Sequence, residues 1–196
     1  DLSAPDEPAR LAGVENVKRC LRYANQVGAR MVGSETSWTA LSDEEKALRR
    51  PLMLDSLQRI AEEAVRLDAV FGVEPVAIHP LCSPEILAEL LQTVNNIKVI
   101  FDPVNLFTTK DAQNAAFQAE HWKSWLAVIG KQLGAMHCKD CRIEPDGTKT
   151  LVGLGKGQMD YAPILDWLAQ VILECAPADI KILHQMQQSI EEKRMK

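Results

Sequence analysis

The sequence lacks the features that define several large classes of protein. It has no apolar run of the roughly 20 residues that a membrane-spanning helix requires, and residues 1–10 lack the basic and apolar regions of a secretory signal. It also lacks an excess of basic charge, because the formal net charge is -5. We therefore expect no nucleic-acid partner and no membrane partner, and a cytoplasmic location.

Cysteine is too sparse and too scattered for a disulfide framework. The five cysteines are an odd number in a chain large enough to need no such framework, so we expect reduced thiols. Cys138 and Cys141 form a Cys-Lys-Asp-Cys pair, a pattern found in zinc and redox sites. No second pair completes a four-thiolate site, which leaves zinc or redox chemistry a minor alternative.

What the sequence does contain is a recurring alternation of a helix and a short apolar strand. Apolar residues at helical spacing, with proline and glycine at the ends, predict helices over residues 14–27, 51–67, 84–94, 112–133 and 161–175. Each is followed by an apolar run that predicts a strand, over residues 29–33, 69–76, 98–101, 135–139 and 180–183. With no linker or low-complexity tract, residues 1–196 are predicted to form one domain.

This alternation predicts an α/β fold with a parallel sheet and crossover helices. A closed (β/α) barrel of the TIM type has eight strands and about 250 residues, whereas only five helix–strand units are found here. We therefore expect an incomplete TIM-type barrel; the family resemblance described below implies that the missing strands are N-terminal. Such an open sheet would expose its edges, which leaves homo-oligomer formation open.

An ionisable residue stands at the end of each predicted strand. These residues are Glu35, Glu74, Asp102, His137 and His184. Because strand side chains alternate between faces, each of them shares a face with the residue two positions earlier. The carboxyl ends of barrel strands converge on one rim, which is where such enzymes place their catalytic groups.

Carboxylates and imidazoles in this arrangement favour a divalent metal site. Oxygen and nitrogen donors suit Mn²⁺, Mg²⁺, Co²⁺ or Zn²⁺. A dication would also keep neighbouring carboxylates ionised, because without it they repel one another. The alternative is that these acids cap helices or form surface ion pairs.

Four short motifs carry a resemblance to a known family. They are Glu74-Pro75-Val76, Phe101-Asp102-Pro103-Val104-Asn105, His137-Cys138-Lys139-Asp140 and Gly153-Leu154-Gly155-Lys156-Gly157. Over nearly its whole length the chain resembles the sugar phosphate isomerase/epimerase family, which has a xylose isomerase-like barrel. The resemblance implies that Glu74, Asp102 and His137 bind one divalent metal ion, with a fourth ligand at the end of the last strand.

The resemblance implies an enzyme that isomerises or epimerises a small sugar, sugar phosphate or related keto compound through an enediolate intermediate. The metal would stabilise the enediolate oxygens while a carboxylate moves the proton. Where the family has a final Glu, this chain has His184, which could ligate the metal and exchange protons near neutral pH. We therefore expect Glu74 and His184 to be catalytic and His184 to complete the metal site.

Further residues are predicted to contact the substrate. They are Glu35, His79, Asn105, Lys139 and Arg142, which lie at or just beyond the strand ends. Hydrogen bonding within loops, a salt bridge and ordinary surface cations are the alternatives for these positions. Of the four tryptophans, only Trp38 is expected near the substrate, and the others are expected to pack on helices.

Two other functions remain in competition with a sugar isomerase. An inactive barrel fragment is suggested by the missing strands and by His184 in place of Glu. A metal-dependent endonuclease that cuts at abasic sites shares this barrel, but it needs more metal ligands and a basic track, and the chain has only four histidines.

Overall fold

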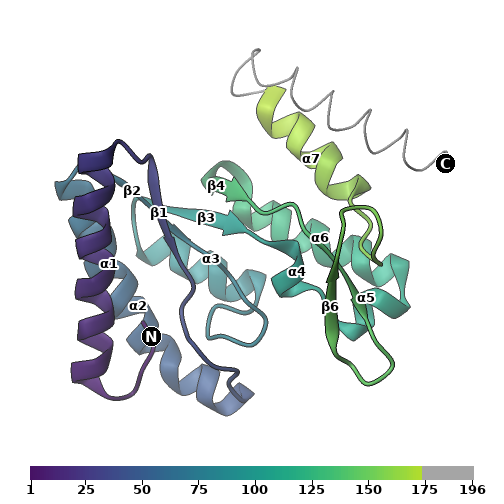
Figure 1. The fold of residues 1–196 in the computed structure, drawn as a ribbon, viewed down its shortest axis with the longest axis horizontal. Coiled ribbons are helices and arrows are strands. Elements are labelled where there is room, and N and C mark those ends of the chain that lie inside the picture. Colours follow the sequence, from purple (N-terminus) through teal and green to yellow (C-terminus); the bar gives the residue numbers. More distant parts are fainter. Residues whose placement is uncertain (174–196) are drawn as a thin grey trace. The chain divides into compact units, whose positions relative to one another are not determined.

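The computed structural model describes residues 1–173, and these residues fall into two compact units (Figure 1). The first unit holds Asp1–Leu106 and Gln132–His137, and the second holds Phe107–Lys131 and the described chain from Cys138 onward. The predicted strand over residues 180–183 and the predicted ligand His184 lie outside the described residues. That residues 1–196 form one domain stays a prediction.

The first unit contains a four-stranded parallel sheet. Its strands follow one another in sequence order: β1 (Met31–Ser34), β2 (Val70–Val73), β3 (Ile97–Phe101) and β4 (Leu133–Met136). Sequential parallel strands joined by helices are the unit from which (β/α) barrels are built. The first four predicted strands are thus confirmed in order and type, and their bounds shift by at most three residues.

Three helices connect these strands: α1 (Glu7–Val27), α2 (Asp43–Arg66) and α3 (Pro84–Thr93). Both α1 and α2 begin earlier than the apolar pattern predicted, because polar residues start them. The Asp6 side chain accepts a hydrogen bond from Ala9 N, and Ser42 and Glu45 form a reciprocal capping box. The predicted start of α3, with Ser83 as N-cap, is confirmed.

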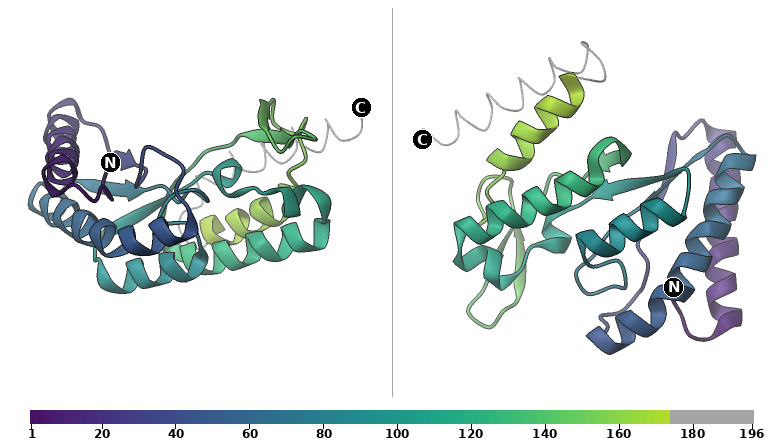
Figure 2. Two further views of the ribbon diagram at one scale, coloured as in Figure 1. Left: turned by 90° about the horizontal axis from the view of Figure 1, so that it is seen from below. Right: turned by 180° about the vertical axis from the view of Figure 1, so that it is seen from behind.

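The core of this unit lies between the sheet and its helices, and α2 and α3 cover one face of the sheet (Figure 2). Alternate strand residues point into this layer, and Phe71, Val73, Val99 and Phe101 are fully buried. The two helices also bury apolar side chains, which include Met53, Leu57, Ile60, Leu87 and Leu90. The opposite strand positions, which include Gly72 and Ile100, therefore face the other side.

On that other face, two glycines make room for one large side chain. A Cβ at Gly33 would overlap Ile100 Cδ1, and a Cβ at Gly72 would lie 2.9 Å from Ile100 Cγ1. Ile100 is only 6% exposed, because it lies over the glycines of the two preceding strands. Glycine at these positions thus lets a β-branched residue fill the inner surface of the sheet.

A register shift between β3 and β4 determines which residue of β4 lies beside each residue of β3. Val99 pairs with Leu133 but Ile100 pairs with Ala135, so Gly134 is an extra residue in β4. Phe101 then pairs with Met136, and His137 N donates to Phe101 O at 2.9 Å. The bulge therefore brings His137, rather than Met136, level with Asp102.

Beyond β3, the structure corrects several predictions. The long helix predicted over residues 112–133 is divided into α5 (Thr109–Gln113) and α6 (Ala115–Ile129), since Asn114 caps α6 by accepting a hydrogen bond from Phe117 N. The predicted strand over residues 135–139 ends instead at Met136. A hairpin of β5 (Asp140–Ile143) and β6 (Lys149–Val152) follows, which the sequence analysis missed, and then α7 (Ala162–Leu173).

Buried polar groups hold the second unit together. The Asp140 carboxylate accepts hydrogen bonds from Cys141 N, Gly157 N and Met159 N, which fixes the glycine-rich loop against β5. In α6, Trp125 Nε1 donates to His121 Nε2 at 2.9 Å, and His121 Nδ1 lies 2.7 Å from Asp111 Oδ1. Because an indole N–H only donates, His121 must carry its proton on Nδ1, facing Asp111.

Two expectations about composition can be compared with the described chain. Cys20, Cys82, Cys138 and Cys141 form no disulfide bond within the described residues, in agreement with reduced thiols. Trp122 and Trp125 are fully buried in α6, as expected of packing residues. Across residues 1–173, none of the helices has both the length and the apolar character needed to cross a bilayer.

Candidate metal centre

Three successive strands each end in a polar residue that belongs to one cluster. Glu74 directly follows β2, Asp102 follows β3, and His137 follows β4. Backbone hydrogen bonds continue the sheet through two of these positions, from Glu74 N to Ser34 O and from His137 N to Phe101 O. The Glu74 and His137 side chains are therefore carried by sheet backbone, and Asp102 follows β3 directly.

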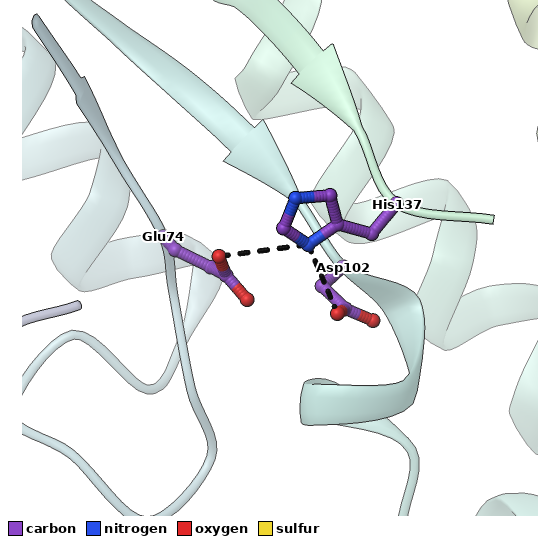
Figure 3. Close-up of side chains that lie close together, drawn as sticks. All are labelled: Glu74, Asp102 and His137. Carbon is purple, nitrogen blue, oxygen red and sulfur yellow. Dashed lines mark hydrogen bonds and ion pairs between the residues drawn. The ribbon is translucent and has the colours of Figure 1, made fainter. Parts of the chain in front are cut away.

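The three side chains point toward one another (Figure 3). His137 Nδ1 lies 3.2 Å from Asp102 Oδ2 and 3.6 Å from Glu74 Oε2. One ligand atom from each residue lies within 4.8 Å of the other two. Ligands bound to one ion at about 2.1 Å are themselves about 3 to 3.5 Å apart, so the cluster is close to the size of a metal site.

The two carboxylates are held in a poorly solvated place. Asp102 is fully buried and Glu74 is 8% exposed, whereas the His137 side chain is 41% exposed. Burial raises the pKa of Glu74, and the negative charges of Asp102 and Glu35 raise it further, while His137 opposes the rise. Without a cation this cluster holds a carboxylate in an unfavourable environment, which is the environment that a bound dication would relieve.

Hydrogen bonds from neighbouring residues fix the two acids. Asp102 Oδ1 accepts from Val104 N at 3.1 Å, within the single turn α4 (Pro103–Leu106). Asn105, in the same turn, donates from Nδ2 to Glu74 Oε1 at 2.6 Å. Asn105 was predicted from the sequence to contact the substrate, and its bond to Glu74 was not predicted. A signal for this arrangement is present in the sequence, because Asn105 stands one helical turn after Asp102.

Glu35 and His79, two predicted substrate residues, also come together. His79 is 3% exposed, and its Nδ1 lies 3.5 Å from Glu35 Oε2 without forming a hydrogen bond to any described residue. Burial lowers the pKa of His79, and the negative charge of Glu35 opposes this. Since Ser34 pairs with Val73, Glu35 stands level with Glu74 at the strand ends.

A hollow of about 300 Å³ adjoins Glu35. Its walls include Ser34, Glu35, Ser37 and Trp38 from the end of β1, and Asn16 from α1. The Trp38 residue is 83% exposed, so one wall is a large uncovered aromatic ring. The expectation that Trp38 alone among the tryptophans lies near a substrate stays a prediction, which this hollow supports.

The remaining predicted residues belong to the second unit or lie outside the described chain. Lys139 was expected to share a strand face with His137, but β4 ends at Met136, so strand alternation cannot orient Lys139. Arg142 was placed in a loop and belongs to β5, where its guanidinium donates to Lys156 O. Substrate contacts by Lys139 and Arg142, and metal ligation by His184, stay predictions.

Parallel strands paired in sequence order and joined by helices, with acids and a histidine at their carboxyl ends, are typical of (β/α) barrel proteins. A family model described as xylose isomerase-like TIM barrel matches residues 1–176. The chain belongs to this family, which confirms the resemblance and the predicted fold class.

Solved structures share this fold at low sequence identity. A D-tagatose 3-epimerase-like protein has a TM-score of 0.71 and 17% identity, over 98% of this chain and 75% of its own. D-Psicose 3-epimerase from Clostridium cellulolyticum H10, solved with D-tagatose, has a TM-score of 0.64 and 17% identity, over 87% and 56%. A xylose isomerase-like TIM barrel protein from Mycobacterium smegmatis, solved with magnesium, has a TM-score of 0.64 and 12% identity, over 87% and 60%.

The chain matches only part of each of these structures. The chain spans 56% to 75% of the lengths of these three structures. No curated protein sequence matches it. The comparisons therefore establish the xylose isomerase-like TIM barrel family and its fold.

Proposed function

We propose that this chain binds one divalent metal ion and takes part in the isomerisation or epimerisation of a small sugar, sugar phosphate or related keto compound. The observation that carries the proposal is the convergence of Glu74, Asp102 and His137 from three strand ends. The neighbouring structures support the substrate class, since two are named as a tagatose 3-epimerase-like protein and a psicose 3-epimerase.

The residues fit a hard or borderline dication. Two carboxylates and one imidazole are donors that Mn²⁺, Mg²⁺, Co²⁺ and Zn²⁺ accept, and no thiolate belongs to the cluster of described residues. Glu74, Asp102 and His137 would hold the ion, with His184 as the proposed fourth ligand. When bound, the ion would supply Lewis-acid stabilisation of negative charge on adjacent substrate oxygens.

Within this proposal, the chain's own residues have separate roles in proton transfer, metal binding and substrate binding. Glu74 would remove and return the proton on the carbon beside the carbonyl, acting as a general base. Asp102 is fully buried and hydrogen-bonded, so it would act as a fixed ligand rather than a proton carrier. Glu35 and Trp38 line the hollow beyond the end of β1, where a carboxylate and an aromatic ring suit sugar hydroxyls and a sugar C–H face.

The test has a binding arm and a chemical arm. Metal-stripped protein is titrated with Mn²⁺ by calorimetry, and exchange of substrate carbon-bound hydrogen with D₂O is followed by NMR for a set of ketoses and ketose phosphates. We expect one equivalent of Mn²⁺ to bind and exchange to depend on it. Glu74→Gln should abolish exchange, whereas Glu44→Gln, an exposed acid on α2, should not.

The two arms separate three outcomes. Binding with exchange supports the isomerase or epimerase proposal. Binding without exchange on any ketose overturns the chemical part and favours an inactive barrel that retains its metal site. Failure of the wild-type protein to bind Mn²⁺, Mg²⁺, Co²⁺ or Zn²⁺ overturns the proposal as a whole.

A further inference from the structure

We infer that Asn105 is a positioning residue that fixes the Glu74 carboxylate for metal binding. This inference rests on the proposed metal site and adds to it a residue outside the ligand set. The sequence predicts a substrate contact for Asn105, whereas in the described chain its side chain donates a 2.6 Å hydrogen bond to Glu74 Oε1. An ionised carboxylate only accepts hydrogen bonds, so the amide presents its NH₂ group to Glu74.

The backbone around Asn105 holds its side chain in place. Its N–H donates to Asp102 O at 3.1 Å, which closes the turn of α4 directly after β3. Its carbonyl accepts from Ala77 N at 3.1 Å, in the loop that follows Glu74. Asn105 is thus bonded to the segment after β2 and to the segment after β3. It joins the two strand ends that carry Glu74 and Asp102.

The two oxygens of Glu74 have different neighbours as a result. Oε1 receives the Asn105 amide, while Oε2 lies 3.6 Å from His137 Nδ1. A carboxylate held at one oxygen by a directional donor cannot rotate freely about its terminal bond. The bond to Asn105 therefore keeps Oε2 directed at the cluster, in the way that outer hydrogen bonds orient metal ligands in general.

A role in positioning leaves a substrate contact open to the same residue. An asparagine amide has two N–H donors and one acceptor oxygen, and the Glu74 bond uses one donor. The distinguishing property of a positioning residue is that its removal weakens metal binding when no substrate is present.

Metal affinity without substrate is therefore the decisive measurement. Asn105→Leu has nearly the shape of asparagine without the donor, and Asn105→Ala removes the side chain. We expect both to weaken Mn²⁺ binding by about 10- to 100-fold, the range found when outer hydrogen bonds to ligands are removed. Asn25→Leu is the matched control. Asn25 donates a comparable hydrogen bond to Leu67 O in an exposed place, and its loss should leave Mn²⁺ affinity unchanged.

A second measurement tests the hydrogen bond in the metal-free protein. The side-chain NH₂ signals of Asn105, assigned by comparison with Asn105→Leu, should be slow in hydrogen exchange in the wild type and faster in Glu74→Ala. Unchanged exchange in Glu74→Ala would overturn the inference, whatever happens with metals.

The outcomes also separate this inference from the proposed function. If wild-type protein binds Mn²⁺ and Asn105→Leu binds it equally well, the positioning role is wrong and the metal site stands. If the wild type binds no divalent ion, both are wrong. A variant that is destabilised without metal, as judged by its melting temperature, is replaced in the comparison by Asn105→Ser, which keeps a shorter polar group and should also bind Mn²⁺ less tightly.

Discussion

His137 Nδ1 lies 3.2 Å from Asp102 Oδ2, although the two residues belong to different strands and are 35 positions apart in the sequence. The extra residue Gly134 in β4 creates this proximity, because it shifts the pairing of β4 with β3 by one residue. Without that bulge, Met136 would stand beside Asp102. The candidate centre therefore depends on backbone register as much as on the identity of its ligands.

Substituting Asp102 should separate metal binding from folding. Asp102→Asn removes one of two buried negative charges, and the amide oxygen can still accept from Val104 N. We expect the metal-free variant to melt at or slightly above the wild-type temperature. Wild-type protein at 100 times its Mn²⁺ dissociation constant should gain about 2.7 kcal/mol, which the variant should lose. Differential scanning calorimetry with and without EDTA measures both effects.

Asp166→Asn, an exposed substitution on α7, is the control and should respond to Mn²⁺ as the wild type does. A Mn²⁺-dependent stabilisation that survives in Asp102→Asn would show that Asp102 is no ligand.

The buried Glu74 carboxylate should make the metal-free protein less stable as pH rises. Its pKa in the folded protein is raised above the ordinary 4.5, so the folded state binds the proton more tightly than the unfolded state does. The stability penalty is absent below pH 4.5, grows as pH rises through the raised pKa, and is complete above it. Glu74→Gln lacks this penalty and should raise the melting temperature at pH 8.

Melting curves of the two metal-free proteins from pH 4 to pH 8 test this expectation. The advantage of Glu74→Gln should shrink as pH falls. An advantage that is constant over the whole range would mean that charge burial at Glu74 is not its cause.

A second carboxylate should act in the opposite direction. Arg66 and Arg22 donate hydrogen bonds to Glu63 and lower its pKa below the ordinary 4.5. The ion pairs therefore contribute stability that is fully present above pH 4.5 and is lost as pH falls through the lowered pKa. Glu63→Gln should lower stability at pH 7 and have a smaller effect near pH 3. Glu62→Gln, the exposed neighbour, should change little at either pH, and urea unfolding at the two pH values gives the comparison.

The glycine-rich loop offers a steric test. A Cβ at Gly157 would overlap Asp140 Oδ1 and Cys141 O, whereas a Cβ at Gly153 meets no atom closer than 3.9 Å. We expect Gly157→Ala to destabilise the second unit by about 1 to 3 kcal/mol, the usual cost of overpacking. Gly153→Ala should stay near wild type. Equal stability of the two variants in thermal unfolding would contradict the packing described around Asp140.

The sequence predicted the parts of this protein that local patterns determine. Apolar spacing located the helices and strands, and strand-end polarity located Glu74, Asp102 and His137. The division of α5 from α6 was missed, because one asparagine cap outweighed a continuous apolar pattern. The hairpin β5–β6 was missed because its strands carry mainly polar and charged residues, which lack the alternation of a half-buried strand.

The contacts that complete the site lay beyond sequence reasoning for a different reason. The bond between Asn105 and Glu74 joins residues 31 positions apart, and it depends on the register of β2 and β3. The bulge at Gly134 likewise depends on the pairing of two strands. Composition and spacing fix which residues stand at a strand end, but pairing decides which of them meet.

Because the tryptophans differ in exposure, their fluorescence can report on the surroundings of Trp38. Trp38 is 83% exposed beside Glu35, while Trp122 and Trp125 are fully buried, and Trp38 is the one tryptophan of the first unit. A small neutral quencher such as acrylamide would reach its indole preferentially, leaving a protected fraction of the emission. Shielding of that accessible fraction by a candidate sugar would then report occupancy of the hollow without any label.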